Sequence, residues 1–208
     1  STTSTYFGHI FSTIEGGLIS TNDYSLYNTL KLLRSHGWMN DIDESEQRKK
    51  KFQWKINDNE EKYTFYVPGF NLRNTEIGSF LGIEQLYKLS AFSEKRNRNY
   101  NLFNELIKND YWKPEIVSEK NVSNLGYPII HPKRNTIMKA LRENDVECRP
   151  LISGSMGRQP FWIERYGRQE MMNASLCHTA GMYAPNGFHI SFEEVELISN
   201  IVNSITCA

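Results

Sequence analysis

Strand-like and helix-like segments alternate from about residue 122 to the end of the chain, and this order constrains the fold more than any other feature. Runs rich in β-branched and aromatic residues predict strands, and apolar residues three or four positions apart predict helices. The expected strands are 125–130, 146–149 and 181–183, and the expected helices are 136–143, 161–166, 170–177 and 192–205. Strands that alternate with helices are typical of an α/β fold.

The preceding part of the chain has a different pattern. It is expected to contain strands at 5–7 and 17–20 around a Glu-Gly-Gly turn, a helix at 24–35, a polar irregular loop at 38–66 and a long helix at 77–107. A charged block within the long helix, 94–98, indicates solvent exposure or a bend there. We place a domain boundary near residue 112, which gives segments 1–112 and 113–208.

Composition excludes several classes of function. The chain has 208 residues, 39% hydrophobic and 23% charged, which is ordinary for a globular protein with its own core. Lys+Arg and Asp+Glu both number 24, so no net charge draws the protein to nucleic acid or to an anionic membrane. Acidic residues flank the basic run 48–51, which predicts a solvated loop. No apolar run is long enough to span a membrane.

The cysteines and histidines do not form a metal site by their spacing. The three cysteines, Cys148, Cys177 and Cys207, are far apart, which fits neither a disulfide framework nor a four-thiolate iron–sulfur cluster. Cysteines used in this way indicate a reducing compartment, and we expect a cytoplasmic protein. The histidines lack metal-ligand spacing, so we expect no metal.

Three motifs follow one another along the chain: STYFGHIFSTIEGG from Ser4, RSHGW from Arg34 and GFNLRNTEIGSFLGIEQLYKLSAFSEKR from Gly69. RQPF from Arg158 is a weaker fourth. Together they resemble the DegT/StrS-type sugar aminotransferases, which are fold type I pyridoxal-phosphate (PLP) enzymes that act on nucleotide-linked keto sugars. The resemblance covers nearly all of the chain.

The resemblance implies a particular portion of that fold. Residues 1–112 would be the C-terminal part of the large PLP-binding domain with a long linking helix, and residues 113–208 the small α/β C-terminal domain. The family's phosphate-binding turn, its ring-stacking aromatic residue and the Asp that pairs with the pyridine nitrogen would lie outside this sequence. We therefore expect the 208 residues by themselves to be inactive and to bind cofactor weakly.

His9 occupies the position at which these aminotransferases carry the Schiff-base lysine, counted back from Glu15. A primary amine forms an imine with the PLP aldehyde, whereas an imidazole does not do so stably. The resemblance thus implies a cofactor held without a covalent bond. Imidazole gains and loses a proton near neutral pH, so His9 would act as the catalytic base.

The same exchange of lysine for histidine is known in the GDP-4-keto-6-deoxymannose 3-dehydratase branch of the family. There, glutamate converts PLP to pyridoxamine phosphate (PMP), which condenses with the C4 ketone of the sugar, and the C3 hydroxyl leaves after the histidine removes a proton. The resemblance implies this reaction, 3-deoxygenation of a nucleotide-linked 4-keto-6-deoxy sugar, in deoxysugar or polysaccharide biosynthesis. The cofactor ring would be the electron sink throughout.

The resemblance also implies binding roles for Ser4, Asn71 and Arg73, and the loop positions and chemistry of Arg149 and Arg158 suggest roles for these two. Ser4 would bind the cofactor phosphate, Asn71 the cofactor phosphate of a neighbouring subunit, and Arg73 anionic substrate, so that a homodimer forms the sites. Arg149 and Arg158 would bind substrate carboxylate or diphosphate, because a guanidinium binds two oxygens at once. The alternatives are a strand-end hydroxyl for Ser4, a loop that only caps the next helix for Asn71 and Arg73, and ordinary surface arginines.

Two other functions remain open at this level. One is an ordinary nucleotide-sugar 4-aminotransferase in which another group replaces the missing lysine. The other is a shortened, non-catalytic homologue that acts as a dimerisation or binding module.

Overall fold

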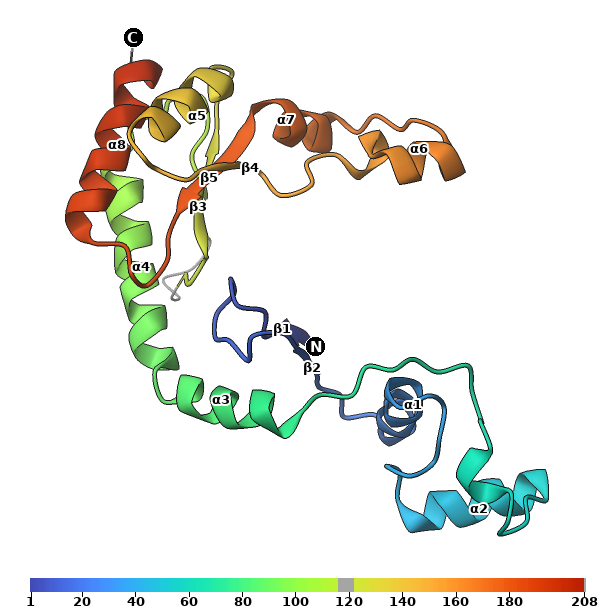
Figure 1. Ribbon diagram of the computed structural model, residues 1–208. Coiled ribbons are helices and arrows are strands. Elements are labelled where there is room, and N and C mark those ends of the chain that lie inside the picture. The colour runs from blue at the N-terminus through green and yellow to red at the C-terminus, as the bar shows by residue number, and fades with distance from the viewer. Residues whose placement is uncertain (116–121, 208) are drawn as a thin grey trace. The chain divides into compact units, whose positions relative to one another are not determined.

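The computed structural model describes residues 1–115 and 122–207 (Figure 1). The helices are α1 (Tyr24–Arg34), α2 (Glu44–Trp54), α3 (Glu76–Leu86), α4 (Leu89–Leu106), α5 (Arg134–Glu143), α6 (Pro160–Tyr166), α7 (Met172–Ala180) and α8 (Phe192–Thr206). The strands are β1 (Thr2–Ser4), β2 (Gly17–Ile19), β3 (Gly126–Ile130), β4 (Arg149–Pro150) and β5 (Gly181–Pro185).

Contacts divide the chain into two compact units, Ser1–Leu86 and Tyr87–Ala208. The sequence pattern indicated a boundary near residue 112. The contact division falls earlier because α4 packs against α8 and belongs with the second unit. No helix in the described part of the chain is long and apolar enough to cross a membrane.

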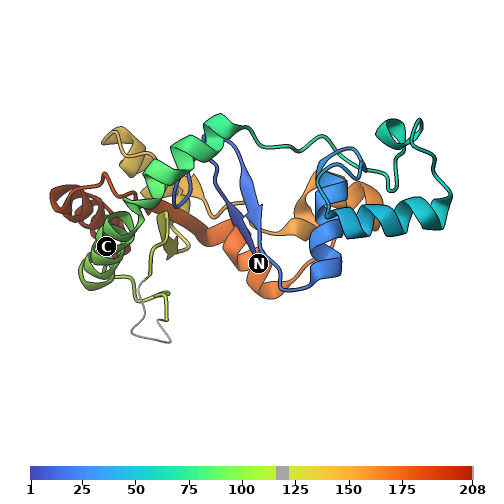
Figure 2. The ribbon, with the colours of Figure 1, turned by 90° about the horizontal axis from the view of Figure 1, so that it is seen from below.

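In the first unit, β1 and β2 form an antiparallel hairpin that pairs Thr2 with Ile19 and Ser4 with Gly17 (Figure 2). The first strand therefore lies before the expected segment 5–7. Main-chain bonds from Thr5 onward close a loop between the two strands instead of extending the ladder.

Helix α1 confirms the helix expected at 24–35. The Asp23 carboxylate accepts a hydrogen bond from the Leu26 N–H at 3.0 Å, which satisfies a free donor of the first turn. At the other end, the Gly37 N–H donates to the Leu32 carbonyl at 2.8 Å. Local sequence signals therefore set both ends of this helix.

The segment 38–66 is not entirely irregular, because it contains α2. No residue of α2 is buried, so the helix has no apolar face that periodicity could reveal. Ion pairs along its surface stabilise it instead, such as Lys49 Nζ to Glu46 Oε1 at 2.6 Å. The basic run 48–51 is helical, with Arg48 and Lys49 exposed, as expected, and Lys50 and Lys51 half-buried.

The long helix expected at 77–107 is two helices, α3 and α4. The chain breaks at Tyr87 and Lys88, before the charged block at 94–98, for which solvent exposure or a bend was expected. The two helices bury different kinds of residue. Helix α3 buries only Gly78 and Gly82, whereas the buried residues of α4 have large side chains. The break coincides with the division between the two units.

The second unit is built on a three-stranded antiparallel sheet with the order β3–β5–β4. Helix α8 packs against α4 and α5, and its Ser191–Glu194 capping box fixes its start. Tyr127 of β3 stacks on Phe103 of α4 with ring centroids 5.1 Å apart. The fully buried large side chains of this core include Phe103, Ile107, Tyr127, Ile129, Ile137, Leu141, Met182, Val195, Ile198 and Val202.

Most segments expected in this unit are confirmed, with shifts of a few residues. The strand expected at 146–149 is the exception, because β4 comprises only Arg149 and Pro150. Val146 instead packs, partly buried, against the core, and a left-handed turn at Asp145 (φ 59°) precedes it. Packing of this apolar side chain therefore replaces strand pairing at that point.

Candidate functional site

His9 lies in a loop that main-chain hydrogen bonds close between β1 and β2. The Thr5 N–H donates to the Gly16 carbonyl and the Phe7 N–H to the Ile14 carbonyl, both at 3.0 Å. The His9 N–H donates to the Tyr6 carbonyl, also at 3.0 Å, in a tight turn. The imidazole is exposed and meets the Tyr6 ring edge-to-face, with centroids 5.7 Å apart. The loop thus presents the side chain at its surface.

Ser4 is the last residue of β1 and is exposed. Its Oγ accepts a hydrogen bond from the Tyr6 N–H at 3.2 Å. A hydroxyl has one proton to donate besides its acceptor lone pairs. This bond therefore orients the Ser4 oxygen and leaves the hydroxyl able to donate to an acceptor such as a phosphate oxygen.

The structure brings the second and third sequence motifs together. The Phe70 N–H donates to the Leu33 carbonyl at 2.7 Å, and the Leu72 N–H donates to the Arg34 carbonyl at 2.9 Å. A β-bridge joins Asn71 to Ser35. The chain that carries Asn71 is therefore fixed along the end of α1, with the Asn71 side chain exposed.

Arg73 follows this fixed segment, just before α3, and is also exposed. The turn after it is ordered by Asn74, whose Oδ1 accepts from the Thr75 N–H at 3.0 Å. Both readings from the sequence, ligand binding and helix capping, are compatible with this position.

Arg149 and Arg158 lie in the second unit, and each binds a carboxylate of its own chain. Arg149 Nε donates to Glu147 Oε1 at 2.9 Å, and this partner raises the pKa of the guanidinium. Arg158 binds Glu170 with Nε to Oε2 at 3.0 Å and Nη2 to Oε2 at 2.8 Å. A ligand at either arginine would have to replace that carboxylate.

Glu170 holds together the chain around α6 and α7. Besides Arg158, its carboxylate accepts bonds from Ser175 Oγ at 2.6 Å and Arg168 Nε at 2.8 Å. These donors, Arg158 first, lower the pKa of Glu170 to about 2. The segment from Arg158 to Ser175 is thus closed by a charged cluster at its base.

Two buried threonines that the sequence analysis did not single out support the His9 loop. Thr5 and Thr13 lie at equal spacing on either side of His9, and their hydroxyl oxygens are 2.6 Å apart. The chemistry of a threonine predicts no particular partner, so no sequence signal identified this pair.

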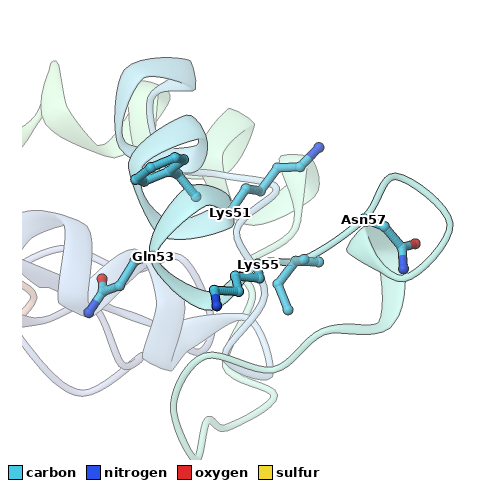
Figure 3. Close-up of a pocket in the computed structure, with 6 residues that line it drawn as sticks. Lys51, Gln53, Lys55 and Asn57 are labelled. Atoms are coloured by element: carbon cyan, nitrogen blue, oxygen red, sulfur yellow. The ribbon is translucent and has the colours of Figure 1, made fainter.

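A surface hollow beside α2 contains none of the candidate residues. It has a volume of about 560 Å³ and is lined by Lys51, Phe52, Gln53, Lys55, Ile56 and Asn57 (Figure 3). Lys51 is engaged by Asp58 at 2.9 Å and Glu61 at 2.7 Å. The described residues also hold no cluster of three or more potential metal ligands.

Comparison with known proteins decides the family. The model of the DegT/DnrJ/EryC1/StrS aminotransferase family matches residues 1–203. The chain belongs to this family. It has the fold of the fold type I PLP-dependent transferases, which the solved structures of the family share.

The relatives of this DegT-family chain include sugar dehydratases. The GDP-4-keto-6-deoxy-D-mannose 3-dehydratase of Yersinia pseudotuberculosis is 35% identical over 210 residues, which cover 97% of this chain and 53% of the relative. The chain therefore spans about half the length of the curated relatives it matches.

Two solved structures of such a dehydratase resemble the chain. One is the Escherichia coli enzyme with bound hydrated PLP, with a TM-score of 0.79, 25% identity and coverage of 97% of this chain and 53% of that one. The other is a histidine-to-asparagine variant of the dehydratase ColD with bound GDP-perosamine. Its TM-score is 0.80, with 25% identity and coverage of 97% and 54%.

Proposed function

We propose that the protein is a PLP/PMP-dependent 3-dehydratase of a nucleotide-linked 4-keto-6-deoxy sugar, working in the cytoplasm in deoxysugar or polysaccharide biosynthesis. The observation that carries this proposal is His9, which stands where the family motif has its lysine. The relatives named 3-dehydratase, at up to 35% identity, support the same reaction.

The donor groups near His9 fit a cofactor that is held without a covalent bond. Ser4 offers a hydroxyl and His9 an imidazole, while the first lysine of the chain is Lys31, on α1. Ser4, with Asn71 of a neighbouring subunit, would hold the phosphate group of PLP or PMP.

The reaction then divides between cofactor and protein. When bound, the cofactor supplies an electron sink. The neutral His9 imidazole would accept a proton and, as an imidazolium, would donate one to the departing C3 hydroxyl. Arg73 would bind anionic substrate, and Arg149 and Arg158 would bind substrate carboxylate or diphosphate once their own carboxylates move away.

Borohydride reduction tests the non-covalent site. We expect the full-length protein treated with PLP and then borohydride to keep its unmodified mass, because reduction attaches the cofactor only where a lysine has bound it. Intact-mass spectrometry measures this. The His9→Lys variant is the matched positive control and should gain one pyridoxyl group. A stable pyridoxyl adduct on any lysine of the unsubstituted protein would contradict the proposal.

We further propose a homodimer whose sites combine both subunits. Asn71 and Arg73 are exposed on a fixed segment, which suits side chains that reach into a neighbouring site. Mixing an inactive His9→Asn protein with an inactive Arg73→Ala protein should restore part of the activity, since one site of each hybrid dimer keeps both residues. Folded hybrids that show no recovery would exclude shared sites.

Product analysis separates the two other functions. A 4-aminotransferase would yield a 4-amino sugar from the same substrate and glutamate, whereas a 3-dehydratase yields a 3-deoxy-4-keto sugar. A non-catalytic homologue would yield neither. The histidine at position 9, with no lysine among residues 1–30 around this motif, favours the dehydratase over the aminotransferase.

A further inference from the structure

The hydroxyls of Thr5 and Thr13 form a buried pair beneath the His9 loop. Their Oγ1 atoms are 2.6 Å apart, and Thr5 and Thr13 are 3% and 8% exposed. Thr13 Oγ1 also lies 3.2 Å from the Glu15 carbonyl oxygen, and the Thr13 N–H donates to the Thr5 carbonyl at 2.9 Å. The two residues thus join the start and the end of the loop.

The loop has no apolar core to replace this pair. Residues 1–20 are all described, and Thr5 and Thr13 are the only buried residues among them. The large apolar side chains of the loop point to solvent, with Phe7 78% and Ile14 60% exposed. Hydrogen bonds therefore hold the loop closed, and the buried hydroxyl pair is the part shielded from competing water.

Neighbouring glycines leave room for the pair. A Cβ on Gly16 would lie 2.7 Å from Thr5 Oγ1 and 2.8 Å from Thr13 Oγ1. A Cβ on Gly82 of α3 would lie 3.0 Å from the Thr13 methyl carbon. Any larger residue at Gly16 would push the hydroxyls apart. The close contact explains why the first glycine of the Glu-Gly-Gly motif has no side chain.

The same loop contains a strained residue. Ile14 has a φ of 72°, a left-handed conformation that is rare for a β-branched side chain. Such strain persists only where the surrounding contacts fix the backbone. Ile14 is held directly by the Phe7 N–H, which donates to its carbonyl, and by Ser12 Oγ, which accepts from its N–H at 3.0 Å, while the bonds of Thr13 hold the residue before it.

We infer that Thr5 and Thr13 are positioning residues for His9. Their hydroxyl pair closes the loop and fixes the direction in which the imidazole points. This inference rests on the proposed function, in which His9 transfers the proton. A base must be held within hydrogen-bond reach of the proton that it moves, and small misplacements are costly.

The test compares Thr13→Val with Thr13→Ser in the full-length protein. Valine keeps the branched shape and removes the hydroxyl, whereas serine keeps the hydroxyl. With PMP bound, Thr13→Val should lower kcat about 10- to 100-fold with KM for the sugar nucleotide unchanged, and Thr13→Ser should restore most of the rate. Without cofactor, hydrogen exchange at the Phe7 and His9 amides should be faster in Thr13→Val than in Thr13→Ser, and exchange in α8 should not change.

Two further variants complete the test. Thr5→Val removes the same bond from the other side, so Thr5→Val, Thr13→Val and the double variant should have similar kcat values. Thr29→Val is the matched control, because it removes an exposed hydroxyl that donates to the Ser25 carbonyl at 2.9 Å on α1. It should leave both the rate and the loop exchange unchanged.

The outcomes separate this inference from the proposed function. If hydrogen exchange in the loop were unchanged in both valine variants, the hydroxyl pair would not close the loop, whatever the activity. Faster exchange with an unchanged kcat would overturn its role in positioning His9. If the unsubstituted protein showed no dehydration at all, the proposed function and the positioning role would both be wrong. Faster loop exchange in the valine variants would still show that the hydroxyl pair closes the loop.

Discussion

Replacing His9 with asparagine is expected to lower kcat about 10²- to 10⁴-fold while binding of PMP and of the sugar nucleotide persists. Asparagine resembles imidazole in size and polarity but cannot carry the proton. The exposed position of His9 on a loop closed by main-chain bonds means that the substitution leaves the fold intact. Steady-state formation of the 3-deoxy sugar and calorimetric titration with PMP measure the two quantities.

A second histidine provides the control for this experiment. His189 is exposed in the other unit, and we assign it no role in the site. His189→Asn should therefore leave kcat unchanged. A His9→Asn protein with the unsubstituted rate would show that another group moves the proton, and the dehydratase proposal in its present form would be wrong.

Replacing Phe103 with alanine is expected to lower the free energy of unfolding of the second unit by about 3–5 kcal/mol. The Phe103 side chain is fully buried at 0% exposure and stacks on Tyr127 at 5.1 Å. Its removal leaves a cavity between α4 and β3 that the sheet cannot close. Because domains are stable by only about 5–15 kcal/mol, this is a large part of the total.

Hydrogen exchange in α8 measures this loss, since two units need not unfold in one step. Val202, at 0% exposure in α8, lies in the same core cluster and its amide should exchange at the rate of full opening of the unit. Phe161→Ala is the control, because Phe161 is 61% exposed. Equal effects of the two substitutions would contradict the description of this core.

Local chemistry along the chain sufficed for the elements with strong end signals. Asp23 predicted the start of α1, and the apolar spacing from Phe192 onward predicted α8. Both predictions rely on residues that are near one another in sequence. In α1 a side chain caps its own helix, and in α8 apolar residues recur at helical spacing. Helix α2 lacked an apolar face, so its charged surface looked like a loop.

The break between α3 and α4 needed tertiary information. Apolar residues continue through Leu86 and Leu89, so the sequence pattern gives no reason to stop. Packing decides it, because α4 is buried against α8 and α3 belongs to the other unit. The central position of β5 in the sheet is likewise a long-range choice, since its partners come from segments far apart in the chain.

For the candidate site, too, some features could be predicted from the sequence and others needed the structure. The motif around His9 and Ser4, with the family resemblance, was visible in the sequence because spacing within one short segment carries it. The pairing of Asn71 with Ser35, the occupation of Arg158 by Glu170 and the hydroxyl pair of Thr5 and Thr13 were not. The first is a main-chain bridge between distant segments, and the other two join side chains whose chemistry allows many partners. Only the folded chain, by bringing one partner within reach, selects among them.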